Sequence, residues 1–380
     1  MIKGKRDVLI ITGRYLPGYK DGGPVRSIKN LTDFLGDEYN FRILTCDRDH
    51  GDTEPYPNIR GNEWNKVGKA EVYYVEPGGF SRKIIIELAN QVDLVYVCGC
   101  FSDYSINTLV AKRLKKIKVP VVVAAMGLFS PMEFRLKYKK KKMFTMLFNL
   151  TGMFKNIYWS ATSEMEISEI KQQVWARDEQ FYIAEDLPRK VDETPIYKEK
   201  EKGKLRIVWI SRIAPKKNLK AAIQILQRVK VEVLFTIYGP VHTEEYWSEC
   251  KELLEKLPYN VTWQYCGNIQ SEEVVNTLKE HHLFLFPTLG ENYGHVIQEA
   301  LSAGCVCLLS DQTPWQDLEK NGAGYIFSLE EVEKYVTQIE EYANMQEDVF
   351  NIWADKAKQY AIKKSNLKVV NTGYREIFKL

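Results

Sequence analysis

The sequence of 380 residues lacks the marks of a secreted or membrane-spanning protein. No uninterrupted apolar run approaches the roughly 20 residues that cross a bilayer as a helix. No signal peptide precedes the first strand-like run at residues 8–11. The seven cysteines are an odd number, and most of them stand in apolar runs, as buried thiols do. We therefore expect a protein of the reducing cytoplasm.

The sequence also has little excess of charge of either sign, and it lacks several ligand motifs. The formal net charge is only +3, which gives no reason to expect nucleic acid as a partner. No set of cysteines and histidines has zinc spacing, and the glycine-rich residues 12–24 fit neither G-x-G-x-x-G nor the P-loop. The sequence thus predicts no metal and no cofactor.

Short apolar runs alternate with helical patterns, and this series occurs twice along the chain. Strands are expected at residues 8–11, 41–44, 94–97, 119–123, 205–210, 233–237, 261–265 and 283–286. Helices are expected near residues 25–35, 105–117, 131–150, 218–229, 245–256, 272–280 and 355–380. Strand runs without polar alternation are typical of a parallel sheet that helices cover on both faces.

A charged stretch divides the two series. Residues 186–204 contain two prolines and a lysine- and glutamate-rich run, which favours a solvated linker. We predict an α/β protein of two doubly wound, Rossmann-like domains that face each other across a cleft. The expected domains are residues 1–187 and 203–355. Residues 356–380 form a last helix that continues the second domain or crosses back to the first.

The densest group of polar and glycine residues follows the strand expected at 283–286. The run F-P-T-L-G-E-N-Y-G-H-V-I-Q-E-A spans residues 286–300 and leads into a helix. The start of such a helix offers unpaired N–H groups and the positive end of its dipole to an anionic or hydroxyl-rich ligand. Gly294 permits a close approach of the backbone. A lone glutamate is usually a solvated surface residue, but Glu291 and Glu299 stand together in this context.

Basic residues follow the strand expected at 205–210. Arg212 comes at the strand end, and Lys217 stands five residues later at the start of the next helix. Arginine can hold a phosphate with two N–H groups, and lysine adds a compact charge. Basic residues in such places are more often simply exposed, so this pattern alone is weak.

These stretches together resemble the retaining glycosyltransferases of family GT4, which have the GT-B fold. The features that carry the likeness are the E-x(7)-E spacing from Glu291 to Glu299, the pair Tyr293-Gly294, Ala300, Gly304, residues 310–315 and residues 322–324. Residues 211–217 resemble the G-R-x(4)-K diphosphate clamp of this family, with Ser211 in place of glycine. Gly22 and Gly23 match a glycine pair that lines the family's cleft. Met126 stands where many members carry a histidine or arginine before a glycine.

The resemblance implies a cytoplasmic enzyme that transfers a hexose-type sugar, with retention and without a metal, from a UDP- or GDP-linked donor. The acceptor would be a saccharide or a lipid-linked saccharide of bacterial surface-polysaccharide synthesis. By this resemblance the catalytic residues are Glu291, Arg212 and Lys217. Donor binding would fall to Gly22, Gly23, Asn292, Tyr293, Gly294, His295, Val296 and Glu299. Glu291 would hold sugar hydroxyls and Glu299 the ribose, and no residue stands out as a nucleophile.

Two further groups have the composition of a metal site but not its context. Asp47-Arg48-Asp49 resembles the D-x-D motif of the GT-A glycosyltransferases, yet a solvated loop is the expected state of three such residues. His281-His282 has no carboxylate or cysteine partner at a suitable spacing, so we interpret it as structural.

Residues 134–159 combine basic and bulky apolar side chains. The run includes Lys139-Lys140-Lys141-Lys142 together with several Met and Phe residues. A basic helix of this kind can rest on an anionic membrane surface. The alternative is a domain helix whose lysines are solvated. The hypothesis places the protein at the inner face of the membrane.

Two other functions stay open at this point. One is a different GT-B activity, such as a sugar-nucleotide epimerase. The other is a catalytically silent subunit that binds a nucleotide sugar or docks on a membrane, although retention of Arg212, Lys217, Glu291 and Glu299 together speaks against it.

Overall fold

The computed structural model describes residues 4–380 except 190, 271–272, 292 and 371–372. The chain divides into two compact units. Unit 1 comprises Met1–Leu187 and Lys368–Leu380, and unit 2 comprises Pro188–Leu367. The chain therefore passes from unit 1 to unit 2 and back again. No helix in the described ranges is long and apolar enough to cross a membrane.

The sheet of unit 1 has the strand order β3-β4-β2-β1-β5-β6-β7-β8 in the described residues. Its pairings are parallel except for the antiparallel pair β3–β4. The strands are β1 Arg6–Ile11, β2 Tyr39–Cys46, β3 Trp64–Val67, β4 Ala70–Val75, β5 Leu94–Cys98, β6 Val121–Ala124, β7 Tyr158–Ala161 and β8 Phe181–Ile183. The helices are α1 Gly23–Leu35, α2 Arg82–Ala89, α3 Asp103–Arg113, α4 Pro131–Arg135, α5 Tyr138–Leu150, α6 Glu164–Lys171 and α13 Tyr374–Ile377.

Two apolar clusters lie on the two faces of this sheet because the side chains of a strand alternate between faces. Leu9 and Ile11 of β1 pack with residues of α2, α3, α5 and α6. Val8 and Ile10 pack on the other face with residues of α1 and of α13. Residues 374–380 thus complete the core of unit 1, where Phe378 meets the rings of Tyr39 and Phe41.

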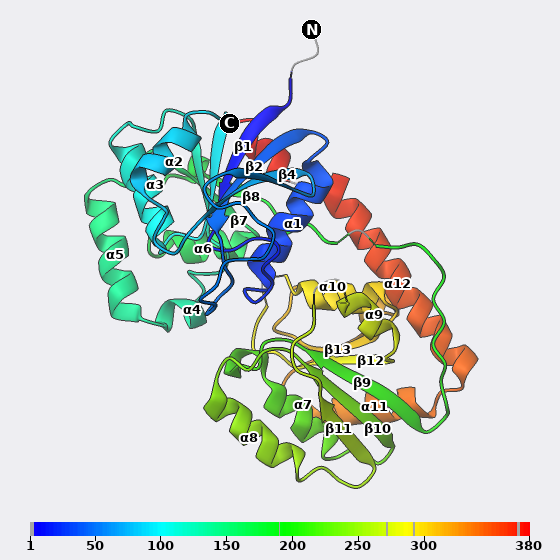
Figure 1. Ribbon diagram of the computed structural model, residues 1–380. Helices are drawn as coiled ribbons and strands as arrows, with labels where there is room; N and C mark the ends of the chain where they lie inside the picture. Colours follow the sequence, from blue (N-terminus) through cyan, green and yellow to red (C-terminus); the bar gives the residue numbers. More distant parts are fainter. Residues whose placement is uncertain (1–3, 190, 271–272, 292, 371–372) are drawn as a thin grey trace. The chain divides into compact units, whose positions relative to one another are not determined.

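The sheet of unit 2 is parallel throughout the described residues, in the order β11-β10-β9-β12-β13-β14. The strands are β9 Lys204–Ile210, β10 Glu232–Tyr238, β11 Val261–Tyr265, β12 Leu283–Phe286, β13 Val306–Ser310 and β14 Gly324–Phe327. The helices are α7 Leu219–Leu226, α8 Glu244–Leu254, α9 Val274–Lys279, α10 His295–Ser302, α11 Val332–Asn344 and α12 Glu347–Val370. Helices α7, α8 and α11 pack on one face, whereas α9 and α10 lie on the other (Figure 1).

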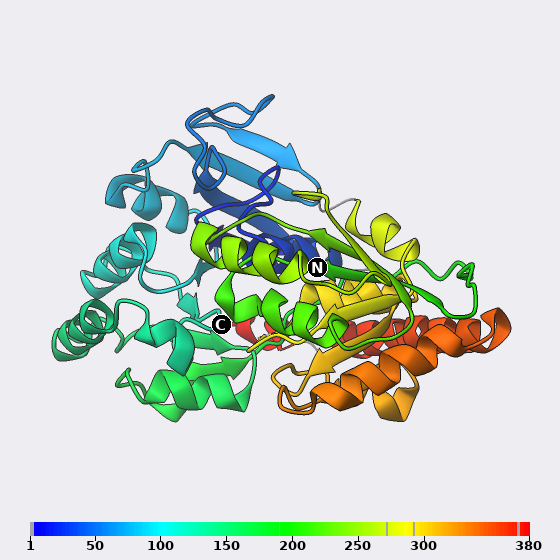
Figure 2. The same cartoon turned by 90° about the horizontal axis from the view of Figure 1, so that it is seen from below.

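Seven of the eight strands expected from the sequence fall within strands of these sheets, and the eighth, expected at residues 119–123, overlaps β6 but begins two residues too early. The helix expected at residues 131–150 is instead two helices, α4 and α5, because Leu136 is extended and Lys137 has a positive φ of 59°. Both views place α5 at the outer margin of unit 1 (Figures 1 and 2).

The expected solvated linker at residues 186–204 is wrong in one respect, because two of its lysines are buried. The ammonium of Lys198 donates to the carbonyls of Leu278 at 2.9 Å and His281 at 2.7 Å. Lys200 donates to the carbonyl of Ala343 at 2.7 Å, at the end of α11. Burial lowers the pKa of Lys198 and lowers that of Lys200 to about 8. The carbonyls at these helix ends carry partial negative charge, so a lysine charge can be buried against them.

Candidate functional site

The strand order of unit 2 creates a switch point between β9 and β12. Chain segments that leave these adjacent strands run to opposite sides of the sheet, which opens a crevice at the carboxyl ends where ligands bind in doubly wound folds. Both segments carry residues expected from the sequence. Arg212 and Lys217 follow β9, and residues 287–291 follow β12.

The segment after β9 begins against the end of β10. The amide of Ser211 donates to the carbonyl of Tyr238 at 3.1 Å. Gly239 has a φ of 131°, and a Cβ there would lie 1.8 Å from the carbonyl oxygen of Ser211. Only glycine fits at this close approach. Arg212 follows directly, and its side chain is exposed. Among the described residues, no hydrogen bond or ion pair holds the Arg212 guanidinium.

Main-chain contacts join the segments that follow β9 and β12. The carbonyl of Lys216 accepts from the amide of Leu289 at 2.9 Å and from the hydroxyl of Thr288 at 3.1 Å. Asn218 begins α7 with a φ of 56°, and its side-chain amide donates to the carbonyl of Pro287 at 2.9 Å. The crevice therefore has a rigid wall before any ligand arrives.

Lys217 and Glu291 form an ion pair at this switch point. Each side chain is only 13% exposed. The amide of Glu291 donates to the carbonyl of Gln312 at 3.1 Å, which also fixes the loop after β13. The structure thus brings together two of the three residues that the sequence suggests as catalytic. A ligand phosphate at this place would compete with Glu291 for the Lys217 ammonium.

Gly294 precedes α10 in the left-handed conformation, with a φ of 77°. A Cβ there would lie 2.6 Å from Cδ1 of Ile297, so a side chain would disturb the first turn. His295 and Glu299 lie on one face of α10, and both are buried, Glu299 to 2% exposure. Val296 is half-buried at the helix start. Asn292, also expected at the donor site, lies outside the described residues.

Trp315 supports this loop from behind, a role that the sequence did not predict. Its indole N–H donates to the carbonyl of Tyr293 at 2.6 Å, and the two rings lie 5.7 Å apart. The ammonium of Lys364 on α12 lies 4.7 Å from the centre of the Trp315 ring and 3.0 Å from Asp317. Trp315 belongs to the stretch 310–315 that contributed to the family resemblance. The sequence therefore pointed to this residue, but it did not predict the contact with Tyr293.

In unit 1, the glycine-rich stretch follows β1, and Gly22 and Gly23 stand at the start of α1. Asp49 fixes this stretch, since its Oδ2 accepts from the amides of Tyr19 at 2.8 Å and Lys20 at 3.1 Å. Asp49 is 3% exposed, and Asp47 is also buried and pairs with Arg48. The expectation of a solvated loop for Asp47-Arg48-Asp49 is therefore wrong. The carboxylates are internal supports, and the described residues hold no group of three or more potential metal ligands.

Met126 lies in the loop after β6, where it is half-buried with a φ of 53°. The next residue, Gly127, donates its amide to Oε1 of Glu166 at 2.5 Å. Oε2 of Glu166 accepts from the amide of Thr162 at 2.7 Å. Glu166 is a buried residue of α6 that ties the loops after β6 and β7 together. Sequence reasoning missed it, although Ser163 to Glu166 has the S-x-x-E spacing of a helix start.

The histidine pair is structural, as expected. Nδ1 of His282 accepts from the amide of Arg206 at 2.9 Å, so its other nitrogen must donate, to the carbonyl of Glu199 at 2.7 Å. Both nitrogens are thereby used by the neutral ring. Burial lowers the pKa of His282 to about 3.

Residues 191–364 match the family model of the glycosyl transferases group 1. This segment is similar to the group 1 glycosyl transferases. It covers the whole sheet of unit 2 and the switch point, whereas unit 1 lies outside it. No curated protein sequence matches the chain.

Solved structures of glycosyltransferases share the fold of the whole chain. HepE from Anabaena, crystallised with UDP and glucose, is 15% identical over 96% of this chain and 98% of its own, with a TM-score of 0.65. A glycosyltransferase from Rickettsia africae is 14% identical over 99% and 98%, with a TM-score of 0.65. WaaG, a glycosyltransferase involved in lipopolysaccharide biosynthesis, is 14% identical over 93% and 95%, with a TM-score of 0.62. The predicted α/β GT-B fold with two Rossmann-like sheets is confirmed.

Proposed function

We propose that the protein transfers a hexose-type sugar from a UDP- or GDP-linked donor to a saccharide or lipid-linked saccharide, with retention of configuration. The observation that carries this proposal is the largely buried ion pair Lys217–Glu291 at the switch point, with the exposed Arg212 in the segment that leads to Lys217. The group 1 match over this segment and the UDP and glucose bound by HepE support it.

The proposed chemistry breaks the bond between the anomeric carbon of the sugar and the oxygen of the nucleoside diphosphate. Negative charge then grows on the leaving diphosphate, and Arg212 and Lys217 stabilise it in place of a metal. The sugar gains oxocarbenium character, as in glycosidic chemistry. The acceptor hydroxyl attacks from the side that the diphosphate leaves, and its proton passes to a diphosphate oxygen.

The remaining residues bind the donor in this proposal. Glu291, partly released by Lys217, accepts hydrogen bonds from sugar hydroxyls, and Glu299 accepts them from the ribose. Amides at the start of α10, around Gly294, His295 and Val296, meet sugar or phosphate oxygens. The glycine pair Gly22-Gly23 lets the backbone of unit 1 approach the donor.

A transfer assay with UDP- and GDP-linked hexoses tests this proposal, with the anomeric configuration of the product read by NMR. Glu291→Gln should lower kcat/KM by about 10²–10³-fold, and Arg212→Ala should lower it by a similar factor. Glu255→Gln, an exposed glutamate of unit 2, is the matched control and should retain full activity. EDTA should leave the rate unchanged.

Three results would contradict parts of the proposal. Conversion of the donor to an isomeric nucleotide sugar would indicate an epimerase. Nucleotide binding without turnover of any donor would indicate a silent subunit. Full turnover by Glu291→Gln beside lost donor binding by Arg212→Ala would remove Glu291 from the site.

We also assign the membrane contact to helix α5, which carries an exposed apolar stripe. Met143, Met146, Leu147 and Leu150 follow helical spacing, and each is more than half exposed. The exposed Trp175 lies beside this stripe, since its amide donates to the side chain of Asn149 at 2.8 Å. Such a stripe beside exposed lysines suits an anionic phospholipid surface, where apolar side chains enter the interface and cations meet the headgroups.

The structure selects which lysines to test. Lys141 donates to the carbonyl of Glu133 at 2.6 Å and Lys142 to Gln173 at 3.0 Å, whereas Lys139 and Lys140 are exposed. Co-sedimentation with phosphatidylcholine vesicles containing phosphatidylglycerol should fall severalfold for Lys139→Gln/Lys140→Gln and for Met143→Ser/Leu147→Ser.

The control is a pair of exposed lysines of unit 2 with the same charge change, Lys202→Gln/Lys256→Gln. Equal binding by the control and the α5 variants would exclude α5 as the docking element. Solvated lysines on an ordinary domain helix would give that result.

A further inference from the structure

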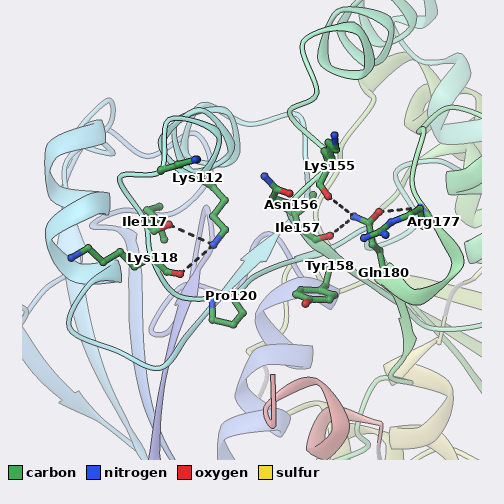
Figure 3. Close-up of a pocket in the computed structure, with 11 residues that line it drawn as sticks. Lys112, Ile117, Lys118, Pro120, Lys155, Asn156, Ile157, Tyr158, Arg177 and Gln180 are labelled. Atoms are coloured by element: carbon green, nitrogen blue, oxygen red, sulfur yellow. Dashed lines mark hydrogen bonds between the residues drawn. The ribbon is translucent and has the colours of Figure 1, made fainter.

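A cationic cavity of about 540 Å³ lies in unit 1, at the edge of the sheet where β6 and β7 begin. This is the edge opposite the carboxyl ends of the strands. Its lining residues are Lys112, Lys115, Ile117, Lys118, Pro120, Lys155, Asn156, Ile157, Tyr158, Arg177 and Gln180 (Figure 3). Five of these eleven residues are basic and none is acidic.

Two polar side chains hold the walls of this cavity in place. The ammonium of Lys112 donates to the carbonyls of Val119 at 2.7 Å and Lys118 at 3.4 Å, and burial lowers its pKa. The buried amide of Gln180 donates to the carbonyls of Phe154 at 3.0 Å and Ile157 at 2.5 Å. The cavity is therefore formed by fixed backbone rather than by surface side chains alone.

Lys115 occupies a position that normally belongs to glycine. Helix α3 ends in a Schellman motif, in which the amide of Lys115 donates to the carbonyl of Lys112 and that of Lys116 to the carbonyl of Ala111. Lys115 has a φ of 56°, the left-handed conformation that glycine adopts at no steric cost. A lysine here strains the backbone and adds a positive charge to the cavity wall.

The charges around the cavity are poorly compensated. Arg177 lies 4.0 Å from Glu179, but both side chains are about 80% exposed, so water and salt weaken this pair. Lys118 stands on one side of the cavity with its ammonium directed outward, and Lys155 and Arg177 stand on the other (Figure 3). The ammonium of Lys112 lies on the first side, so a multiply charged anion between the two sides would meet cations from both.

We propose that this cavity binds a phosphate-bearing anion with at least two negative charges. Lysine and arginine are the usual protein partners of phosphate, and the volume is in the range of small-ligand sites. This site goes beyond the proposed function, because it lies at the edge of the unit 1 sheet opposite the one that carries the glycine-rich stretch. The ligand is a soluble diphosphate or the phosphate of a lipid headgroup.

Hydrogen–deuterium exchange of the full chain with inorganic pyrophosphate tests the site by location. Protection is expected in peptides covering residues 112–120 and 154–158. Any diphosphate held by Arg212 and Lys217 would protect residues 211–218 instead, so the two proposals fail independently. The same measurement with phosphatidic acid vesicles, and with phosphatidylcholine vesicles as the blank, separates the lipid source from the soluble one.

Lys115→Gly is the decisive variant, because glycine suits the Schellman position. Its Tm should rise by about 2 °C, while pyrophosphate binding weakens about fivefold. Lys137→Gly is the matched control, since Lys137 has a φ of 59° and does not line the cavity. It should gain stability in the same way and bind pyrophosphate like the parent chain.

Lys118→Gln/Lys155→Gln, which removes one cation from each side, should weaken binding further. If neither pyrophosphate nor phosphatidic acid protects these peptides, the proposal is overturned. Equal weakening by Lys115→Gly and Lys137→Gly would overturn it as well, because it would reduce the effect to general surface charge.

Discussion

The two units differ in what holds the loops that leave the carboxyl ends of their strands. In unit 1 the supports are buried carboxylates, Asp49 for the stretch after β1 and Glu166 for the loops after β6 and β7. In unit 2 the corresponding loops are joined by main-chain contacts and by the pair Lys217–Glu291, and the exposed Arg212 belongs to the first of these loops. This difference supports the proposal that the donor phosphates bind at the carboxyl edge of unit 2.

The two units also differ in where lysine is buried. Unit 2 buries Lys198, whose amino group donates to carbonyls at the end of α9. A buried lysine thus serves as a support in unit 2, whereas buried carboxylates serve in unit 1. Substitutions that remove one support at a time test this contrast.

The largest stability loss is expected from Lys198→Met in unit 2. The substitution removes the ammonium and leaves carbonyls of Leu278, Lys279 and His281 buried without it. We expect a loss of about 2–3 kcal/mol in the free energy of unfolding, measured by urea titration. The exposed neighbour Lys202→Met is the control and should stay within about 0.5 kcal/mol of the parent. A loss no greater than that of the control would show that Lys198 is not a structural support.

Trp315→Phe should act on the donor site of unit 2 as well as on its stability, because Trp315 is buried. Loss of the hydrogen bond to the carbonyl of Tyr293 frees the loop before α10, so the donor KM should rise about tenfold with a smaller change in kcat. Steady-state kinetics measure this split. Trp353→Phe, the same change at a tryptophan that makes ring contacts with Tyr325 and Tyr342, should leave KM unchanged. A fall in kcat alone would argue against a positioning role for Trp315.

Asp49→Asn tests the carboxylate support of unit 1. An NH2 group in place of Oδ2 cannot accept from the amides of Tyr19 and Lys20, and turning the side chain over would instead lose the bond that Oδ1 accepts from the amide of His50. Amides of residues 15–24 should therefore exchange faster, and stability should fall by about 1 kcal/mol. Asp52→Asn breaks an exposed ion pair with Lys20 and should change little. If both variants exchange alike, the buried carboxylate does not hold the stretch.

The last prediction concerns an acid sensitivity of unit 2. His282 has a folded pKa of about 3 against an ordinary value of 6.5, because burial disfavours its charged form. Between these values the unfolded chain binds a proton that the folded chain does not, so stability falls as the pH drops through this window. Urea midpoints at pH 7 and pH 4.5 should differ less for His282→Gln than for the parent. His281 remains in both proteins, and burial lowers its pKa too. An equal pH dependence of the variant and the parent would exclude His282 as a source of the acid sensitivity.

Much of the fold was predictable because it depends on local patterns. Apolar runs without alternation gave the positions of the strands, and the switch-point residues Lys217 and Glu291 belong to short motifs. The supports were not predictable, because each joins residues that are far apart in the sequence. Lys198 reaches α9, Glu166 reaches Gly127, and Trp315 reaches Tyr293. Composition even misdirected the prediction for residues 186–204, where lysines suggested solvent exposure.

The return of the chain to unit 1 sets an order for its synthesis. Residues 368–380 are made after the whole of unit 2, yet Tyr374 and Phe378 fill the core beneath β1 and β2. A nascent chain therefore carries unit 1 with an open apolar face on the ribosome while the continuous segment of unit 2 can already fold. During that interval the face that α13 later covers stays exposed to water.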